Sequence, residues 1–377
     1  MRDTRHPGLD PGSSTGPRVK PGVTALWVCL FLFSLSAQAH THTPQQRPNL
    51  FNPGITAFGN MLTCAGDCPK IFQLREVELD IRSSIDPWAD GVLIISIEPP
   101  HGDHDHDVIG VEEGYAVLKK LPILDDAPWG LTLKAGKYLL PLGRFNQIHT
   151  HDLPQIDQPL VIRELLNHHA LARVGFSGEF FIPTPGENNS LRLNLNLIQG
   201  GGLEVEKISN PRYPAGLIHS AWFWDLAPEH DLEWGLSTYL EDNKNPGKGL
   251  LQLYGVDLNY KWRPYQQGDK YSFLLGGEFF IANGIENKGG RHPLGFFVWT
   301  QYQLNQWFYP SLRYSYVPGT EQNIRQAAGA FLTFYTTEFL RLRAGYEYDI
   351  GRNQSQFLFE LNFVLGSHPV EPYWVNR

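Results

Sequence analysis

The sequence predicts an all-β protein, a transmembrane antiparallel β-barrel of about sixteen strands with long external loops. Three observations lead to this fold class. Apolar and polar residues alternate along many segments, long connections alternate with short ones, and aromatic residues are abundant, with 22 Phe, 16 Tyr and 10 Trp. Each strand of such a barrel has one face toward lipid and one toward the lumen, and aromatic residues gather at the membrane interfaces.

Alternation of period two is clearest at residues 191–197, where leucines occupy one face and Arg192 shares the other with two asparagines. The same period recurs at 339–348 and 356–365. A secreted soluble β-sandwich is the alternative fold, because its apolar faces would form a core. In a barrel, the outward side chains would include Leu193, Leu342 and Phe359, and the inward ones Arg192, Arg343 and Glu360.

The lengths of the connections separate these two folds. Connections after odd-numbered predicted strands are mostly long, and those after even-numbered strands are mostly short. The external loops and periplasmic turns of an outer-membrane barrel differ in this way, whereas a soluble sandwich has no reason to show the alternation. The predicted strands cover residues 51–64, 70–83, 89–99, 108–120, 129–142, 171–183, 188–200, 213–227, 231–241, 249–263, 271–283, 294–304, 307–317, 325–337, 339–350 and 353–366.

The N-terminal segment 1–39 has the features of a leader with a cleavable signal peptide. An apolar stretch follows Arg18 and Lys20, and Ala37-Gln38-Ala39 after it is a small-x-small cleavage pattern. The stretch is short for a bilayer-spanning helix, although a retained N-terminal anchor is the alternative. We therefore expect cleavage after Ala39 and residence in the bacterial outer membrane. The barrel would occupy residues 40–366 and a tail residues 367–377.

Two cysteines, Cys64 and Cys68, follow the leader. In an oxidising periplasm they could close a small disulfide loop. Free thiols are one alternative, and a metal pair completed by Asp67 is another. The spacing leaves these alternatives open.

Histidine clustering is the main chemical signal. Residues 101–107 hold three His and three Asp, which are ligand types that suit Zn²⁺. We therefore expect no obligatory cofactor but a possible Zn²⁺ site in this external loop, with a solvated acidic loop as the alternative. The candidate metal ligands are His101, His104, His106, Asp103, Asp105 and Asp107.

Two classes of function are disfavoured. A formal net charge of −8 argues against nucleic acid as a partner, because its recognition needs a basic face. After the leader, the sequence also lacks the G-x-S-x-G and H-E-x-x-H motifs and a phosphate-cradling loop. We therefore expect the protein not to be an enzyme.

Short motifs resemble known outer-membrane proteins. Residues 133–143 resemble the G-[RK]-x-x-x-P-x-G strand of phosphate- and oligosaccharide-type porins. Most of the chain after the leader resembles uncharacterised proteobacterial proteins loosely labelled zinc-regulated TonB-dependent receptors. A plug domain and a 22-stranded barrel, which such receptors have, are not expected in a chain of this length. The residues that carry the wider resemblance are Phe51-Asn-Pro-Gly-Ile55, Glu112, Glu113, Tyr115, Lys134, Lys137 and Asp157-x-Pro159-Leu160.

The longest connection, 143–170, follows the fifth predicted strand, and residues 159–166 in it could form a helical turn. A connection this long usually has a function. The resemblance to sixteen-stranded porins implies that this third external loop folds into the lumen and forms a constriction. The histidines of this loop could bind a metal ion or make ordinary hydrogen bonds, and the sequence leaves both interpretations open. The constriction residues would be His149, His151, Asp152, Arg163, His168 and His169.

These features together predict a porin-like channel for small hydrophilic solutes or ions, in contact with outer-membrane lipid. Sixteen strands leave an aqueous channel unless a loop closes it. A link to zinc uptake is a further hypothesis. The alternative to a channel is a metal-binding receptor barrel with a closed pore. By analogy with porins, we expect a homotrimer. The predicted pore-lining residues are Arg82, Lys134, Arg192, Lys261, Arg313, Arg341, Arg343, Glu78, Asp80, Asp257, Glu347 and Glu360.

Overall fold

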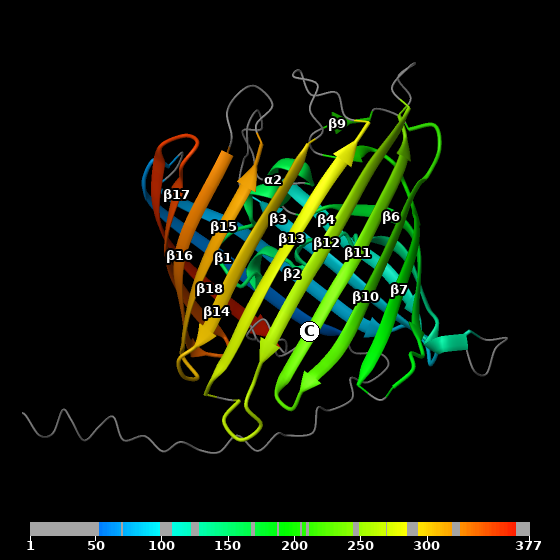
Figure 1. Ribbon diagram of the computed structural model, residues 1–377, viewed down its shortest axis with the longest axis horizontal. Helices are drawn as coiled ribbons and strands as arrows, with labels where there is room; N and C mark the ends of the chain where they lie inside the picture. Colours follow the sequence, from blue (N-terminus) through cyan, green and yellow to red (C-terminus); the bar gives the residue numbers. More distant parts are fainter. Residues whose placement is uncertain are drawn as a thin grey trace, which may run out of the picture. The chain divides into compact units, whose positions relative to one another are not determined.

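The structure, a computed structural model, describes residues 53–68, 71–98, 108–121, 128–166, 170–186, 188–203, 206–208, 211–243, 249–268, 270–284, 293–318 and 325–366. Sixteen strands form one closed antiparallel barrel (Figure 1). Each barrel strand pairs with the next barrel strand of the sequence, and β1 (Gly54–Gly66) pairs with β18 (Gln354–Gly366) to close the ring. The predicted fold class is confirmed, and the soluble sandwich is excluded.

The remaining elements follow the same order in the chain and in space. A short hairpin of β8 (Gly202–Leu203) and β9 (Glu206–Lys207) lies outside the barrel sheet. The other barrel strands are β2 (Phe72–Ser84), β3 (Ala89–Glu98), β4 (Val108–Leu118), β5 (Thr132–Leu139), β6 (Ala172–Ile182), β7 (Asn189–Ile198), β10 (Ala215–Ala227), β11 (His230–Asp242), β12 (Leu250–Trp262), β13 (Ser272–Asn283), β14 (Leu294–Gln303), β15 (Phe308–Val317), β16 (Arg325–Thr337) and β17 (Leu340–Asp349). The helical segments are η1 (Pro128–Gly130), η2 (Phe145–Gln147), η3 (Thr150–Asp152) and α2 (Leu160–Leu165).

All the predicted strands are present, with bounds that agree to within a few residues. One difference has a clear cause. The fifth strand was expected over 129–142, but β5 ends at Leu139. The Leu140 N–H still donates to the carbonyl of Leu171 at 2.9 Å, but by Gly143 the backbone has left β6 and its N–H donates to Ser237 of β11 at 3.0 Å.

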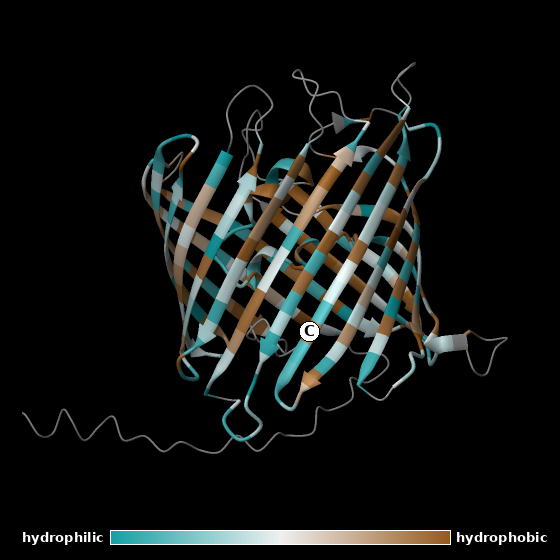
Figure 2. Ribbon diagram, in the orientation of Figure 1, coloured by the Kyte–Doolittle hydropathy of each residue, from teal (hydrophilic) through white to brown (hydrophobic). Residues whose placement is uncertain are grey.

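The two faces of the wall have the polarity of a membrane barrel. Apolar and polar residues alternate along the strands in Figure 2. Phe359 is 46% exposed on the outer face, whereas its neighbour Glu360 is 0% exposed. Arg343 is likewise buried on the inner face while Leu342 is turned away from it. This arrangement places charged side chains inside and apolar side chains outside, the reverse of a soluble protein.

The connections at the two ends of the barrel differ in length, as predicted. Residues 228–229 join β10 to β11 and residues 338–339 join β16 to β17, both on the short side. On the other side, residues 140–171 join β5 to β6. The described residues of this segment, 140–166 and 170–171, are called the inserted loop; it is the predicted third external loop, and its inward fold is confirmed.

The inserted loop occupies the lumen as a packed structure. Most of its apolar side chains form one buried cluster with inward-facing residues of β12, β13 and β14, among them Leu253, Phe280 and Phe297. Phe145 at the start of η2 lies edge-on to Phe297, with ring centroids 4.8 Å apart. Burial of apolar surface at about 25 cal/mol per Å² is the main stabilisation available to such a loop.

No helix among the described residues has the length and apolar character needed to cross a membrane.

This packing leads to a first prediction. Phe145 is 1% exposed, so Phe145→Ala should leave a cavity between the inserted loop and β14 and lower the free energy of unfolding by about 3–5 kcal/mol. Urea unfolding and hydrogen exchange of the loop amides would measure the effect. Tyr265→Ala removes a side chain that is 79% exposed and should change little. Equal effects of the two substitutions would show that the loop is not packed in the lumen.

Candidate functional site

The inserted loop enters the lumen through a fixed turn at Gly143. Its φ of +65° lies in the left-handed region, and a Cβ there would come within 2.4 Å of the Glu278 carboxylate. That carboxylate, on β13, accepts the backbone N–H groups of Arg144 at 2.8 Å and Phe145 at 2.7 Å. Ser237 on β11 accepts the N–H of Gly143 at 3.0 Å. The wall therefore sets the direction in which the loop starts.

Arginines of β17 hold the middle of the inserted loop by its backbone. Arg341 donates to the carbonyl of His151. Arg343 donates to the carbonyls of Leu153 and Gln155, both at 2.5 Å, and also pairs with Glu360 of β18. A loop without regular hydrogen bonds would otherwise bury unpaired carbonyls at high cost. The guanidinium forks supply the missing donors.

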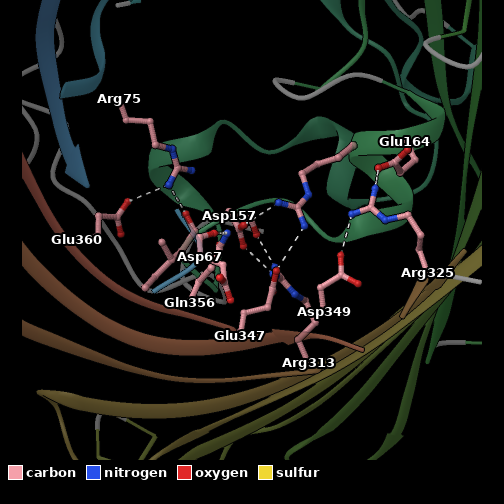
Figure 3. A network of polar contacts seen from close by, with 12 residues as sticks. Asp67, Arg75, Asp157, Glu164, Arg313, Arg325, Glu347, Asp349, Gln356 and Glu360 are labelled. Atoms are coloured by element: carbon pink, nitrogen blue, oxygen red, sulfur yellow. Dashed lines mark hydrogen bonds and ion pairs between the residues drawn. The ribbon is translucent and has the colours of Figure 1, made fainter. Parts of the chain in front are cut away.

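A second set of ion pairs centres on Asp157 (Figure 3). Arg313 of β15 contacts Asp157 at 2.6 Å and Glu347 of β17 at 2.5 Å. Arg163 of α2 contacts Asp157 at 3.1 Å. Burial acts to raise the pKa of Asp157, but the charges of Arg313 and Arg163 outweigh it and lower that pKa to about 2. Further along α2, Glu164 pairs with Arg325 of β16.

Carboxylates gather on another sector of the wall, where β2 carries Glu76 and Glu78 and β4 carries Glu112 and Glu113. Glu113 lies opposite Ile94 of β3, while the next pair joins Val111 to Ile95, so Glu112 is left out of the register. Such a bulge re-aims side chains, and it lets two consecutive carboxylates approach the same imidazole.

The same irregularity occurs in the pairing of β1 with β2. Asn60 of β1 lies opposite Glu76 and Met61 opposite Leu74, which leaves Arg75 out of the register. Arg75 then donates to the carbonyl of Ile156 in the inserted loop at 2.6 Å. Figure 3 shows it reaching toward Glu360, 3.9 Å away.

Two histidines of the inserted loop meet the carboxylates. His149 Nδ1 lies 3.2 Å from Glu112 and 3.4 Å from Glu78, and its Nε2 lies 3.1 Å from Glu113. His151 Nδ1 lies 3.5 Å from the same Glu78 oxygen. Burial opposes protonation, but Glu78, Glu112 and Glu113 raise the pKa of His149 well above its usual value.

Stacked rings fix the positions of these imidazoles. His149 and His151 stack with centroids 5.6 Å apart, and Phe58 of β1 stacks on His151 at 3.9 Å. Asp152, next in the chain, lies 3.8 Å from His151 Nε2. The arrangement can hold a positive charge, either a proton shared with the carboxylates or a metal ion.

The predicted site residues fall into several groups. Among the constriction residues, His149, His151, Asp152 and Arg163 lie in the lumen, and His168 and His169 lie outside the described residues. The predicted metal ligands His101, His104, His106, Asp103, Asp105 and Asp107 also lie outside them. The predicted pore-lining residues that are buried on the inner face are Glu78, Asp80, Asp257, Arg313, Arg341, Arg343, Glu347 and Glu360.

The other predicted pore-lining residues are more exposed. Arg82 pairs with Asp80 at 2.7 Å, and Lys261 pairs with Asp231 at 2.6 Å. Arg192 lies 3.8 Å from Glu233. Lys134 lies over the ring of Tyr115, 4.5 Å from its centroid. The charges of the lumen are therefore largely paired with one another or with the inserted loop.

Several contact residues were not among the predicted site residues. Glu76 was detectable, since it continues the alternation of Glu78 and Asp80 on the same face of β2. Arg75 and Glu112 were not, because simple alternation turns a bulged position to the wrong face. The Sγ atoms of Cys64 and Cys68 are joined in a disulfide, with Cα atoms 6.1 Å apart.

Comparison with known proteins identifies the fold. No protein-family model matches the chain. An uncharacterised protein of Aquifex aeolicus (strain VF5) is 25% identical over an alignment 349 residues long, which covers 80% of this chain and 70% of that protein. Salmonella typhi OmpF in complex with daunomycin has a TM-score of 0.54 at 6% identity, over 83% of this chain and 97% of that one. An anion-selective porin from Comamonas acidovorans has a TM-score of 0.52 at 8% identity, over 84% and 100%.

The chain has the fold of outer-membrane porins. The sixteen strands of the barrel distinguish it in size from outer-membrane transporters with 22 strands and a plugged lumen. The identities to these solved structures support a shared architecture and carry no residue roles to this chain.

The Asp157 ion pairs lead to a second prediction. An unfolded aspartate titrates near pH about 3.9, so the lowered pKa of Asp157, about 2, stabilises the fold above that pH. The contribution should disappear as the pH falls toward about 2. We expect Asp157→Asn to lower the free energy of urea unfolding at neutral pH and to match the wild type at the acid end.

The matched control is Asp225→Asn at an exposed position of β10. It should shift the free energy of unfolding little at any pH. A wild-type advantage over Asp157→Asn that stayed constant down to pH 2 would contradict the assigned ion pairs.

Proposed function

We propose that the protein is a porin-like channel of the bacterial outer membrane for small hydrophilic solutes, with the inserted loop as its constriction. The observation that carries this proposal is the inserted loop itself, held by charged side chains inside a closed barrel of sixteen strands. The porin fold supports it. The expected signal peptide, with cleavage after Ala39, would export the chain.

The outer face of the barrel supports lipid as a partner. Phe176, Leu197 and Phe359 are 69%, 56% and 46% exposed on different strands. Exposed apolar residues continue around the barrel, for example Val256 on β12 and Leu312 on β15. A soluble monomer seldom exposes a contiguous apolar surface of this kind, whereas a barrel in lipid needs it.

The short side of the barrel retains a cavity in which charged side chains lie beside aromatic and aliphatic ones, among them Phe223 and Trp299. It has a volume of about 280 Å³ and is also lined by Arg144 of the inserted loop, Glu233 and Asp231 of β11, and Lys261 of β12. Charged side chains of both signs line it, so it does not favour either ion charge.

One observation favours a second candidate function, a metal-binding receptor barrel with a closed pore. At the level of the inserted loop, wall residues from distant strands are fully covered, and Glu78, Leu253, Phe280 and Glu360 are each 0% exposed. The loop therefore contacts the wall in several directions. A link to zinc uptake would fit this candidate or a gated channel.

Other parts of the proposal extend the analogy with porins. We propose a homotrimer as the assembled form, and a protein that transports rather than catalyses. The G-x-S-x-G and H-E-x-x-H motifs of hydrolases and metalloproteases are missing from residues 40–377. Chemical cross-linking of the folded protein in detergent would measure the number of subunits.

A third prediction concerns conduction. Arg341→Ala removes a donor to the inserted-loop carbonyl of His151, so planar-bilayer recordings should show a larger and noisier conductance than the wild type. Arg352→Ala changes an exposed turn residue and should conduct like the wild type. If the wild type and both variants are folded and none of them conducts, the channel is excluded and the closed barrel is favoured.

A fourth prediction tests the membrane face. Phe359→Arg places a charge on the outer face in the interior of β18 and should lower the free energy of unfolding in lipid vesicles by about 2–4 kcal/mol. Leu365→Arg lies at the end of the strand, where the same charge should cost about 0–1 kcal/mol. Similar costs at both positions would argue against a lipid-spanning wall.

A further inference from the structure

Six side chains form a buried cluster where the inserted loop meets β2 and β4. This carboxylate–histidine cluster comprises Glu76, Glu78, Glu112, Glu113, His149 and His151.

Two sets of possible metal ligands overlap within the cluster. One set takes a single atom from each of Glu76, Glu78 and His151, and the other from each of Glu78, Glu112 and His149. Within each set the atoms lie within 4.8 Å of one another. Three convergent protein ligands of the carboxylate and imidazole types, with room for one more, are the usual provision for Zn²⁺ outside closed structural sites.

Several polar atoms aimed into the cluster make no hydrogen bond, and Glu78 Oε2 has only the longer ion-pair contacts of 3.4 and 3.5 Å to the two imidazoles. The atoms without a hydrogen bond are Glu76 Oε2, both carboxylate oxygens of Glu78, and His151 Nδ1. Their residues are 4%, 0% and 4% exposed respectively. A buried carboxylate without hydrogen bonds carries a large desolvation cost. A cation bound between these atoms would offset that cost, which the surrounding protein groups do not compensate.

The histidines are also oriented as metal ligands are. His149 directs Nε2 to Glu113, which in turn accepts the backbone N–H of Leu139 at 2.7 Å, and this leaves Nδ1 facing Glu78 and Glu112. His151 directs Nε2 toward Asp152 and Nδ1 toward Glu78. Carboxylates behind the far ring nitrogen fix the orientation and basicity of metal-bound histidines.

Nearby basic side chains are engaged elsewhere. Arg75 donates to the carbonyl of Ile156 and lies 3.9 Å from Glu360. Lys134 lies over the rings of Tyr115 and Tyr138. In the part of the chain that the structure describes, the ion-pair partners of the cluster carboxylates are the two imidazoles. The cluster therefore has an excess of negative charge that a divalent cation would balance.

We propose that the carboxylate–histidine cluster binds a divalent transition-metal cation such as Zn²⁺, with Glu78 as the ligand shared by both sets. The imidazole ligands come from the inserted loop and the carboxylate ligands from the wall, so the ion cross-links them. This site shares no ligand with the histidines of residues 101–107. It needs only the barrel and its inserted loop, and is therefore independent of whether the barrel conducts.

The experiment uses the folded full-length chain carrying His101→Ala, His104→Ala and His106→Ala, which removes the other histidine cluster. After treatment with a chelator, calorimetry should show at least one Zn²⁺ bound per chain, and Co²⁺ should produce visible absorption bands. Glu78→Gln in the same background should weaken binding by about 100-fold or more, since even outer-shell changes cost about 10- to 100-fold. His149→Gln and His151→Gln, which alter the loop and no strand, should each weaken it too.

His219→Gln is the matched control. His219 is a buried histidine of β10 that contacts Ser237 at 2.9 Å on another part of the wall, and its substitution should leave Zn²⁺ affinity unchanged. Circular dichroism would establish that each variant is folded. If the background protein binds no Zn²⁺, or if the His149→Gln and His151→Gln variants bind it as tightly, the proposal is overturned. The cluster would then be a structural ion pair between a protonated His149 and its carboxylates.

Discussion

The pairing of β1 with β18 is the constraint on which the rest of the structure depends. It closes the sheet, so every strand has hydrogen-bonded neighbours on both sides and no edge is left exposed. Closure also divides the side chains of each strand between an outside and an inside. Sixteen strands make the inside wider than wall side chains alone can fill, and the inserted loop occupies that space.

The loop is retained by two kinds of interaction that act on different parts of it. Apolar residues such as Phe145 and Leu160 pack against an apolar sector of the inner wall. The stretch between them has little regular backbone hydrogen bonding, and Arg341, Arg343 and Arg75 donate to its carbonyls. Packing gives the loop most of its stabilisation, while the arginines avoid the cost of unpaired buried carbonyls.

The charged side chains of the lumen therefore do not simply line a pore. Arg313 and Arg343 form ion pairs and loop contacts, and the charged residues that line the cavity on the short side are a separate set that includes Lys261 and Asp231. The carboxylate–histidine cluster joins the loop to the wall at a third place. A change in the charge state or occupancy of that cluster would act directly on the position of the inserted loop.

The sequence by itself determined the strands, the alternation of long and short connections, and the inward direction of residues such as Arg313, Arg343 and Glu360. These properties are local, because period-two alternation assigns each side chain to a face. Only the tertiary structure decided that bulges turn Arg75 and Glu112 inward, since a bulge depends on the register with the partner strand. Only the tertiary structure brought His149 and His151 to Glu76 and Glu78, because contacts between residues about seventy positions apart are set by how the loop folds back across a closed barrel.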